Sequence, residues 1–303
     1  MLVLVNGLPL FSQRLVRDLN LLDPNNRYIF TNTYYSKIDK IKFIFLLLFA
    51  KIVISFNGVS DESGSLNWVL RLKKKLMMQW QGTDVSLAVE RYKLNTINKK
   101  YIDYATHFTD APWLKDELNG ILKSIDILPF KYIETDQDPE KFSKISVLSY
   151  IGKGREEFYG YEIIKASAKA NPSIDFHIIG IDGKNLDKIE NIYFYGWITD
   201  NEVKKIMKRV PIFVRLTQHD GNSLVVTEAL SYGCEVIWSY PYEKCYLVNS
   251  IEELNQIIIE LSEKIKHRNY EPNLDNIKFV KENYNKNQVI GNYIKKINDV
   301  ANK

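Results

Sequence analysis

Short apolar runs rich in β-branched residues alternate along this chain with segments of helical periodicity, and the whole alternation occurs twice. The first series lies within residues 1–128, and the second begins with the apolar run at 145–150. Strands that alternate with helices in this way are typical of βαβ units and parallel sheets. The sequence therefore predicts an α/β protein with two parallel sheets, and ligands in such sheets bind beyond the carboxyl ends of the strands.

The length and one polar segment place the domain boundary. A chain of 303 residues is long enough for two domains of ordinary size. Residues 131–143 are polar, contain Pro139 and have no apolar periodicity. Segments of this kind usually connect domains. We therefore expect one domain over 1–143 and a second that begins at residue 144.

Composition indicates a folded protein of a reducing compartment. Hydrophobic residues make up 45% of the chain and charged residues 26%, which excludes a disordered or collagen-like chain. The two cysteines, Cys234 and Cys245, are too few for a disulfide framework, and we expect both to be buried apolar residues. The amino terminus has no basic segment before its short apolar run, so no signal peptide is expected. The predicted location is the cytoplasm.

Positive charge is concentrated in the first third of the chain. Residues 1–100 carry 15 Lys and Arg against 7 Asp and Glu, although the net charge of the whole chain is only +4. Such a segment can face an anionic membrane, an anionic substrate or nucleic acid, or it can be an ordinary solvated surface. No aromatic motif supports nucleic-acid binding, and we do not expect it.

The longest apolar stretch, residues 41–56, is interrupted by Lys42 and Lys51. A membrane-spanning helix needs about 20 apolar residues, so this stretch does not span. We expect a buried helix that ends by Ala50, followed by a strand at 52–56. The alternative is peripheral contact with the inner face of a membrane, because the apolar side chains lie beside several lysines.

Two common nucleotide-binding motifs are missing. Gly7 is the only glycine at the end of the first expected strand, so there is no G-x-G-x-x-G, and no G-x-x-x-x-G-K-[ST] occurs anywhere. This argues against a nicotinamide enzyme and a P-loop NTPase. The four histidines are scattered singly and give no zinc spacing. Asp136 and Asp138 have a spacing that suits a divalent metal, but they lie in the polar linker, where a solvated loop is favoured.

The most informative segment is 212–237, IFVRLTQHDGNSLVVTEALSYGCEVI. An apolar run leads into a polar turn and then into a helix, whose first turn presents three backbone N–H groups, those of Asn222, Ser223 and Leu224. Free N–H groups at a helix N-terminus suit an anion such as a diphosphate. Asp220 precedes this helix and Glu228 lies about two turns along it, so the two carboxylates could reach two parts of one ligand.

This segment resembles the E-x7-E signature of the retaining GT-B glycosyltransferases of family 4 (glycosyl transferases group 1), with Asp220 and Glu228 as the two acids. The resemblance extends over nearly the whole chain. Five further segments are similar to motifs of this family. On the donor side, YIGKGREEFYG at 150–160 is similar to the phosphate-binding G-R…K-G loop, and the turns at 178–180 and 194–197 are similar to the nucleotide-side turns. On the acceptor side, QWQGTDV at 79–85 is similar to the H-G-x-D turn, and FTDAPWLKDEL at 108–118 is similar to the S-x-x-L helix.

The resemblance implies a GT-B fold, with two Rossmann-like domains whose parallel sheets face a central cleft. It assigns acceptor binding to residues 1–143 and nucleotide-sugar donor binding to residues 144–275. Residues 276–303, with a helix expected at 287–300, would pack back on the first domain.

The implied activity is retaining transfer of a hexose-type sugar from a nucleotide-diphosphate sugar to a glycan or polyprenyl-lipid-linked acceptor, without a metal or other cofactor. By resemblance, Glu228 would bind the ribose hydroxyls and Asp220 the donor sugar. Lys153 and Arg155 would stabilise the leaving diphosphate, because fixed cations stabilise charge that develops in a transition state. The candidate catalytic residues are therefore Asp220, Lys153 and Arg155.

Further donor contacts implied by the resemblance are Gly221, Asn222, Ser223, Leu224, Gly152, Gly180, Tyr195, Gly196 and Gly7. On the acceptor side the candidates are Gln81 and Asp84, and Asp84 could instead cap the following helix.

Two departures from the family pattern leave alternatives open. Tyr159 stands where the family has its second basic residue, and Gln81 stands at the histidine of the acceptor turn and cannot act as a base. One alternative is a nucleotide-sugar 2-epimerase of the same fold. The other is a non-catalytic carbohydrate- or membrane-binding module with a degenerate donor site.

Overall fold

The computed structural model describes residues 1–134 and 139–302. Its internal contacts divide the chain into two units, here called unit 1 and unit 2. Unit 1 comprises Met1–Tyr132, Asp220–Asn222 and Lys286–Lys303, and unit 2 comprises Ile133–His219 and Ser223–Asn285. Asp136 and Asp138 lie outside the described residues.

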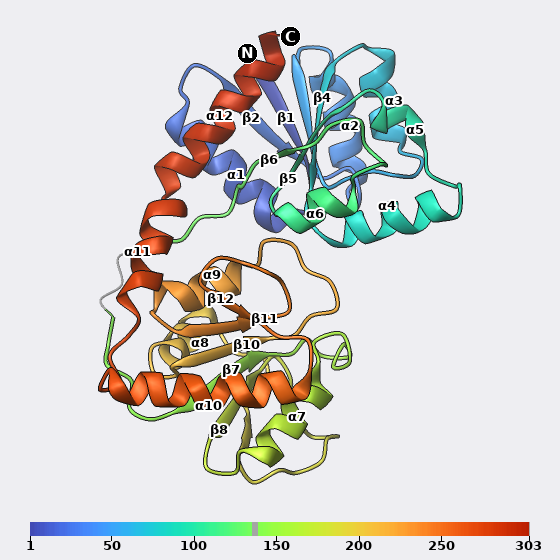
Figure 1. Ribbon diagram of the computed structural model, residues 1–303. Coiled ribbons are helices and arrows are strands. Elements are labelled where there is room, and N and C mark those ends of the chain that lie inside the picture. Colours follow the sequence, from blue (N-terminus) through green and yellow to red (C-terminus); the bar gives the residue numbers. More distant parts are fainter. Residues whose placement is uncertain (135–138, 303) are drawn as a thin grey trace. The chain divides into compact units, whose positions relative to one another are not determined.

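Unit 1 is built on a six-stranded sheet in the order β2-β1-β3-β4-β5-β6, with every neighbouring pair parallel (Figure 1). Its strands are β1 Leu2–Gly7, β2 Arg27–Thr31, β3 Ile52–Phe56, β4 Lys75–Trp80, β5 Thr106–Thr109 and β6 Asp126–Ile127. Its helices are α1 Pro9–Leu22, α2 Lys37–Leu47, α3 Gly64–Arg71, α4 Thr83–Lys93, α5 Lys99–Ile102, α6 Pro112–Glu117 and α12 Lys286–Asn302.

Unit 2 is built on a second six-stranded parallel sheet, in the order β12-β11-β10-β7-β8-β9. Its strands are β7 Ser146–Tyr150, β8 Asp175–Ile179, β9 Ile192–Phe194, β10 Ile212–Arg215, β11 Glu235–Trp238 and β12 Cys245–Leu247. Its helices are α7 Tyr161–Ala170, α8 Asp200–Met207, α9 Leu224–Ser231, α10 Ile251–His267 and α11 Leu274–Asn283. The α/β fold class predicted from the alternation is confirmed in both units.

Helix α12, at the end of the chain, completes the core of unit 1. Its side chains Ile290, Tyr293 and Ile297 are fully buried in the cluster that includes Val3 and Ile54 of the sheet. The Tyr293 hydroxyl also donates a hydrogen bond to the Gln79 side chain at 3.2 Å. Burial of these side chains removes apolar surface from water, which stabilises the docked helix.

Two expected helices differ in the structure. The sequence pattern of 86–101 predicts one polar helix, but the structure has two helices there, because α4 ends at Lys93 and Asn95 adopts a left-handed backbone with φ of 55°. The helix expected up to Ala50 is buried on one side only, at Phe43 and Leu47, while its opposite side is exposed. In the described part of the chain, no helix has the length and apolar content needed to cross a membrane.

A buried carboxylate joins three segments of unit 1. Asp18 on α1 accepts hydrogen bonds from the Tyr132 hydroxyl at 2.5 Å and from Lys286 Nζ at 2.9 Å, and it pairs with Arg17 Nε at 3.1 Å. Tyr132 is where the chain first leaves unit 1, and Lys286 is where it returns for the last time. Burial acts to raise the pKa of Asp18, but these hydrogen bonds and the Lys286 charge hold it below its ordinary value.

We expect Asp18→Ala to lower the free energy of unfolding by about 2 kcal/mol at neutral pH, because its partners are left without their acceptor. A carboxyl whose pKa is lowered by folding stabilises the protein above its unfolded pKa, and this contribution disappears as the pH falls towards the folded pKa. The difference between wild type and variant should therefore shrink below about pH 4. Urea unfolding at several pH values measures it, and equal stability at neutral pH would contradict the assignment.

Candidate active site

Each sheet has one point at which the order of its strands reverses. In unit 1 this point lies between β1 and β3, and in unit 2 it lies between β7 and β10. Ligands of open α/β sheets bind beyond the carboxyl ends of the strands at such a point. The loops after these four strands are therefore the candidate sites, and each unit has one.

In unit 2, the loop after β7 carries two of the predicted catalytic residues, Lys153 and Arg155, both exposed. The loop is closed by a hydrogen bond from the Arg155 backbone N–H to the Gly152 carbonyl at 3.0 Å. The pKa of Asp182, just beyond β8, is lowered first by the Lys184 backbone N–H, then by the Lys184 charge and side chain, and also by the Lys153 charge. Because this loop follows β7, it places Lys153 at the carboxyl end of the sheet.

A third cation, Arg215, joins this loop from the last position of β10. Its guanidinium carbon lies 5.6 Å from the centre of the Tyr159 ring, and that of Arg155 lies 5.8 Å from the same ring. Tyr159 in turn contacts Tyr150 edge to face, with ring centres 5.3 Å apart. Burial and the neighbouring Tyr159 raise the pKa of the Tyr150 hydroxyl, and the charges of Arg215 and Arg155 oppose that shift. Two guanidinium groups thus lie beside Tyr159, which stands where the family has its second basic residue.

The loops after β7 and β10 are in direct contact. The Gln218 backbone N–H donates to the Phe158 carbonyl at 3.0 Å. A side chain at Gly160 would approach the Leu216 carbonyl to 2.8 Å, so only glycine permits this close contact. Arg215 was not predicted from the sequence as a site residue, because nothing in the strand pattern connects it with the earlier loop.

Two of the predicted donor glycines, Gly180 and Gly196, meet just after the ends of β8 and β9. Gly180 donates its N–H to the Gly196 carbonyl at 2.8 Å. It has a φ of +97°, and a side chain there would collide with the Ile151 carbonyl, so glycine is required. The hydroxyl of Tyr195 lies 2.8 Å from Nδ1 of His177 in the middle of β8.

Helix α9 provides the remaining predicted donor residues of unit 2. Ser223 is its N-cap residue and makes no capping hydrogen bond with its side chain, and Leu224 is its first helical residue. Ser223 is buried, whereas Glu228, the fifth residue of α9, is partly exposed. Leu224 and Glu228 thus belong to one short helix, whereas Asn222, predicted for its first turn, precedes the N-cap residue.

Residues Asp220–Asn222 belong to unit 1. The Trp113 indole N–H donates to the Asp220 carbonyl at 2.7 Å, and the Asn222 N–H donates to the Asp110 carboxylate at 3.4 Å. The same carboxylate pairs with Lys131 at 2.7 Å. Asp110 and Lys131 were also not predicted, because their proximity depends on tertiary structure.

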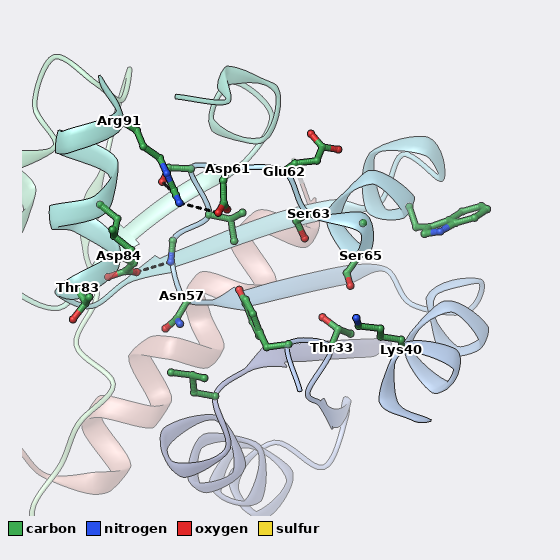
Figure 2. Close-up of a pocket in the computed structure, with 18 of the residues that line it drawn as sticks. Thr33, Lys40, Asn57, Asp61, Glu62, Ser63, Ser65, Thr83, Asp84 and Arg91 are labelled. Atoms are coloured by element: carbon green, nitrogen blue, oxygen red, sulfur yellow. Dashed lines mark hydrogen bonds and ion pairs between the residues drawn. The ribbon is translucent and has the colours of Figure 1, made fainter. Parts of the chain in front are cut away.

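In unit 1, a pocket of about 740 Å³ opens beyond the ends of β1, β2, β3 and β4 (Figure 2). Its walls are polar on several sides, with Thr33, Asn57, Ser63 and Ser65 directed towards it in Figure 2. The volume is within the range of pockets that hold small ligands and sugar-sized groups. Hydroxyl and amide side chains of this kind suit a hydroxylated ligand because they both donate and accept hydrogen bonds.

The predicted acceptor residues Gln81 and Asp84 both adjoin this pocket. Asp84 lines it, and its carboxylate accepts backbone N–H groups from Gly58 at 2.5 Å, Gly82 at 2.8 Å and Gln81 at 3.0 Å. The Gln81 amide donates to Asn57, a lining residue, at 3.2 Å. Burial raises the pKa of Asp84, while these backbone N–H groups favour its charged form. Asp84 thus ties the loop after β3 to the start of α4.

Both signs of charge occur at the rim of the pocket. Arg91 donates to Asp61 at 2.8 Å and to the Ser60 hydroxyl at 2.7 Å (Figure 2). Lys40 and Glu62 also line it. Gly7, predicted to approach the donor, lies at the end of β1 in close contact with its neighbours, because a side chain there would lie 2.7 Å from Phe56 and from Ser12. Among the described residues, no group of three or more His, Cys, Asp or Glu is arranged to hold a metal.

Two α/β units, each built on a parallel sheet, constitute the GT-B fold. The sequence matches no family model, and no curated protein is significantly similar to it. Among solved structures, sucrose-phosphate synthase from Thermosynechococcus elongatus superposes with a TM-score of 0.71 at 11% identity, over 99% of both chains.

Two other solved structures share the fold. TarM of S. aureus, crystallised with Fondaparinux, alpha-GlcNAc-glycerol and UDP, has a TM-score of 0.60 at 16% identity, and the alignment covers 88% of this chain and 59% of TarM. A Listeria monocytogenes protein assigned as a UDP-N-acetylglucosamine 2-epimerase has a TM-score of 0.55 at 11% identity, over 96% and 94% of the two chains. This chain therefore spans well under two thirds of TarM.

Proposed function

We propose that this protein is a glycosyltransferase that uses a nucleotide-diphosphate sugar, binding the donor on unit 2 and the acceptor in the pocket of unit 1. The observation that carries the proposal is the group of cations at the strand reversal of unit 2: Lys153, Arg155 and Arg215. Cations fixed at that position suit a diphosphate, which gains negative charge as it leaves. The crystallised complex of TarM with UDP supports the donor class.

In the proposed reaction, the bond between the sugar C1 and the diphosphate oxygen breaks, and the acceptor oxygen bonds to C1 on the same face. The acceptor proton passes to an oxygen of the leaving phosphate, so Gln81 need not act as a base. Asp220 would hold the donor sugar and Glu228 the ribose. We propose that the transfer is retaining, concerns a hexose-type sugar, and requires no metal.

The remaining assignments are proposals of the same kind. The division into an acceptor domain over 1–143, a donor domain over 144–275 and a returning helix in 276–303 fits the pocket of unit 1 and the cations of unit 2. The acceptor is a glycan or a polyprenyl-linked sugar, and the protein acts in the cytoplasm, at the inner face of the membrane.

Glu228→Ala tests the donor assignment. We expect it to weaken the binding of the preferred nucleoside diphosphate about tenfold, because the ribose hydroxyls lose a charged acceptor. Isothermal titration calorimetry with UDP, GDP and ADP measures the affinity. Glu260→Ala, at an exposed position of α10, is the matched control. Equal affinities of the Glu228 variant and wild type would refute the role of this carboxylate.

The second candidate is a nucleotide-sugar 2-epimerase, which is favoured by the fold shared with the Listeria protein. The two functions differ in their need for an acceptor. Incubation with a nucleotide sugar alone yields an epimer only if the protein is an epimerase, whereas a transferase leaves the sugar configuration unchanged. Nuclear magnetic resonance of the anomeric region distinguishes the two results.

A further inference from the structure

Helix α2 of unit 1 has apolar side chains on two opposite sides. Phe43 and Leu47 point inward and are fully buried. The opposite side, continued by the two residues that follow the helix, carries a row of large apolar side chains, here called the outer stripe: Ile38 at 78% exposure, Ile41 at 73%, Phe45 at 62%, Leu48 at 57% and Phe49 at 66%. The first four recur at spacings of three and four residues, which places them on one face of a helix. The core of unit 1 is complete without them.

Lysines flank the outer stripe along the helix. Lys37, Lys40 and Lys42 are exposed and, by helical geometry, lie on either side of it. The only acidic residue of α2, Asp39, is turned away, since its carboxylate accepts the Asn32 backbone N–H at 3.1 Å. An exposed apolar face with a basic border matches the chemistry of an anionic membrane surface.

The helix that carries the outer stripe also borders the candidate acceptor pocket. Lys40 and Ile44 of α2 line that pocket, and Ile44 is itself 39% exposed. Trp68 of α3, which is 38% exposed, lines it as well. A surface that rested on a bilayer through the outer stripe would therefore hold the pocket next to the headgroups.

We propose that the outer stripe of α2 docks on an anionic lipid bilayer and presents the unit 1 pocket to an acceptor carried by a lipid. The second half of this statement rests on the proposed function, whereas the docking does not. A second copy of the chain fits the stripe less well, because a two-fold contact would bring like-charged lysines together. A bilayer of anionic lipids neutralises them instead.

The test is flotation of the purified protein with vesicles. Vesicles of equal parts phosphatidylglycerol and phosphatidylcholine should carry the wild-type protein, and vesicles of phosphatidylcholine alone should carry much less. The double variant Ile41→Ser, Phe45→Ser should partition about tenfold less strongly. Leu274→Ser with Ile259→Ser, which removes two exposed apolar side chains from unit 2, should partition as wild type does.

Two results would overturn the proposal. One is wild-type protein that does not float with the anionic vesicles. The other is a wild-type dimer in sedimentation velocity that the α2 double variant converts to monomer, since the stripe would then be an interface between copies. Nucleoside diphosphate binding by calorimetry is measured in parallel. Protein that binds vesicles but no nucleoside diphosphate would contradict the proposed function alone. Protein that binds a nucleoside diphosphate but no vesicles would contradict the docking alone.

Discussion

Arg215→Ala should weaken the binding of a nucleoside diphosphate about a hundredfold while leaving the binding of the nucleoside alone unchanged. The reason is that a guanidinium holds phosphate oxygens through charge-assisted hydrogen bonds, each of which contributes about 1.5–3 kcal/mol. Arg215 lies at the end of β10 beside Tyr159. The family that this sequence resembles has a basic residue at the position of Tyr159. In the proposed chemistry, Arg215 supplies the charge that Tyr159 lacks.

The same substitution should lower kcat more than it raises KM for the donor. Negative charge on the leaving diphosphate is larger in the transition state than in the bound donor, so a cation stabilises the former more. Arg215→Lys should retain part of the activity, because the charge remains but the paired geometry is lost.

A rescue variant makes this prediction specific. Tyr159→Lys in the Arg215→Ala background should restore most of the diphosphate affinity, since it returns a cation to the same loop. Arg209→Ala removes an exposed arginine from the same unit and serves as the control. Thermal melting verifies that each variant is folded. Unchanged diphosphate affinity in a folded Arg215 variant would exclude this residue from the donor site.

The predicted strands were most accurate where a strand is buried on both faces. The expected strand at 52–56 coincides with β3, whose five residues are all buried. A parallel strand covered on both sides reads as a continuous run of β-branched residues, so the sequence alone specifies it. Helix α11, which was not predicted, also had a local signal, because Asn273 caps it by accepting the N–H groups of Asp275 and Asn276.

The features that were not predicted depend on tertiary structure. Apolar composition predicted a buried helix before residue 50, yet composition cannot tell which side of a helix meets the sheet. The outer stripe of α2 is visible only in the structure. Likewise, Arg215 and Tyr159 are far apart in the sequence, and only the contact between two loops at a strand reversal brings them together. The resemblance to a family motif predicted Lys153 and Arg155, which lie in one loop. Arg215 comes from a neighbouring strand, and no local sequence pattern indicated it.

A second large effect is expected at the floor of the unit 1 pocket, where Gly58 lies against Trp80. A methyl group at position 58 would fall inside the indole ring of Trp80, which is fully buried. The indole cannot move without breaking a hydrogen bond, because its N–H donates to Nδ1 of His107 at 3.1 Å. The other ring nitrogen of His107 lies 2.8 Å from the Ile102 carbonyl, which fixes the neutral tautomer with its proton on Nε2. Burial also lowers the pKa of His107, in agreement with a neutral ring.

Gly58→Ala should therefore lower the free energy of unfolding by about 3 kcal/mol, the upper part of the range for overpacking in a core. The displaced loop should also lose the hydrogen bond from the Gly58 N–H to Asp84. We expect acceptor-dependent transfer to fall by at least tenfold, while a nucleoside diphosphate still binds, because Lys153, Arg155 and Arg215 belong to unit 2. Urea unfolding and calorimetry measure the two quantities.

Gly64→Ala provides the matched control for this substitution. Gly64 lines the same pocket, but a side chain there has no atom within 4 Å, and the position is the first residue of α3. Alanine favours a helix over glycine by about 1 kcal/mol, so this variant should be as stable as wild type or slightly more stable. Transfer should be nearly unchanged, since one methyl group occupies little of the pocket. If both alanine variants lost transfer equally while remaining stable, the effect would lie in the pocket surface and not in the contact between Gly58 and Trp80. If neither lost transfer, the acceptor would bind elsewhere.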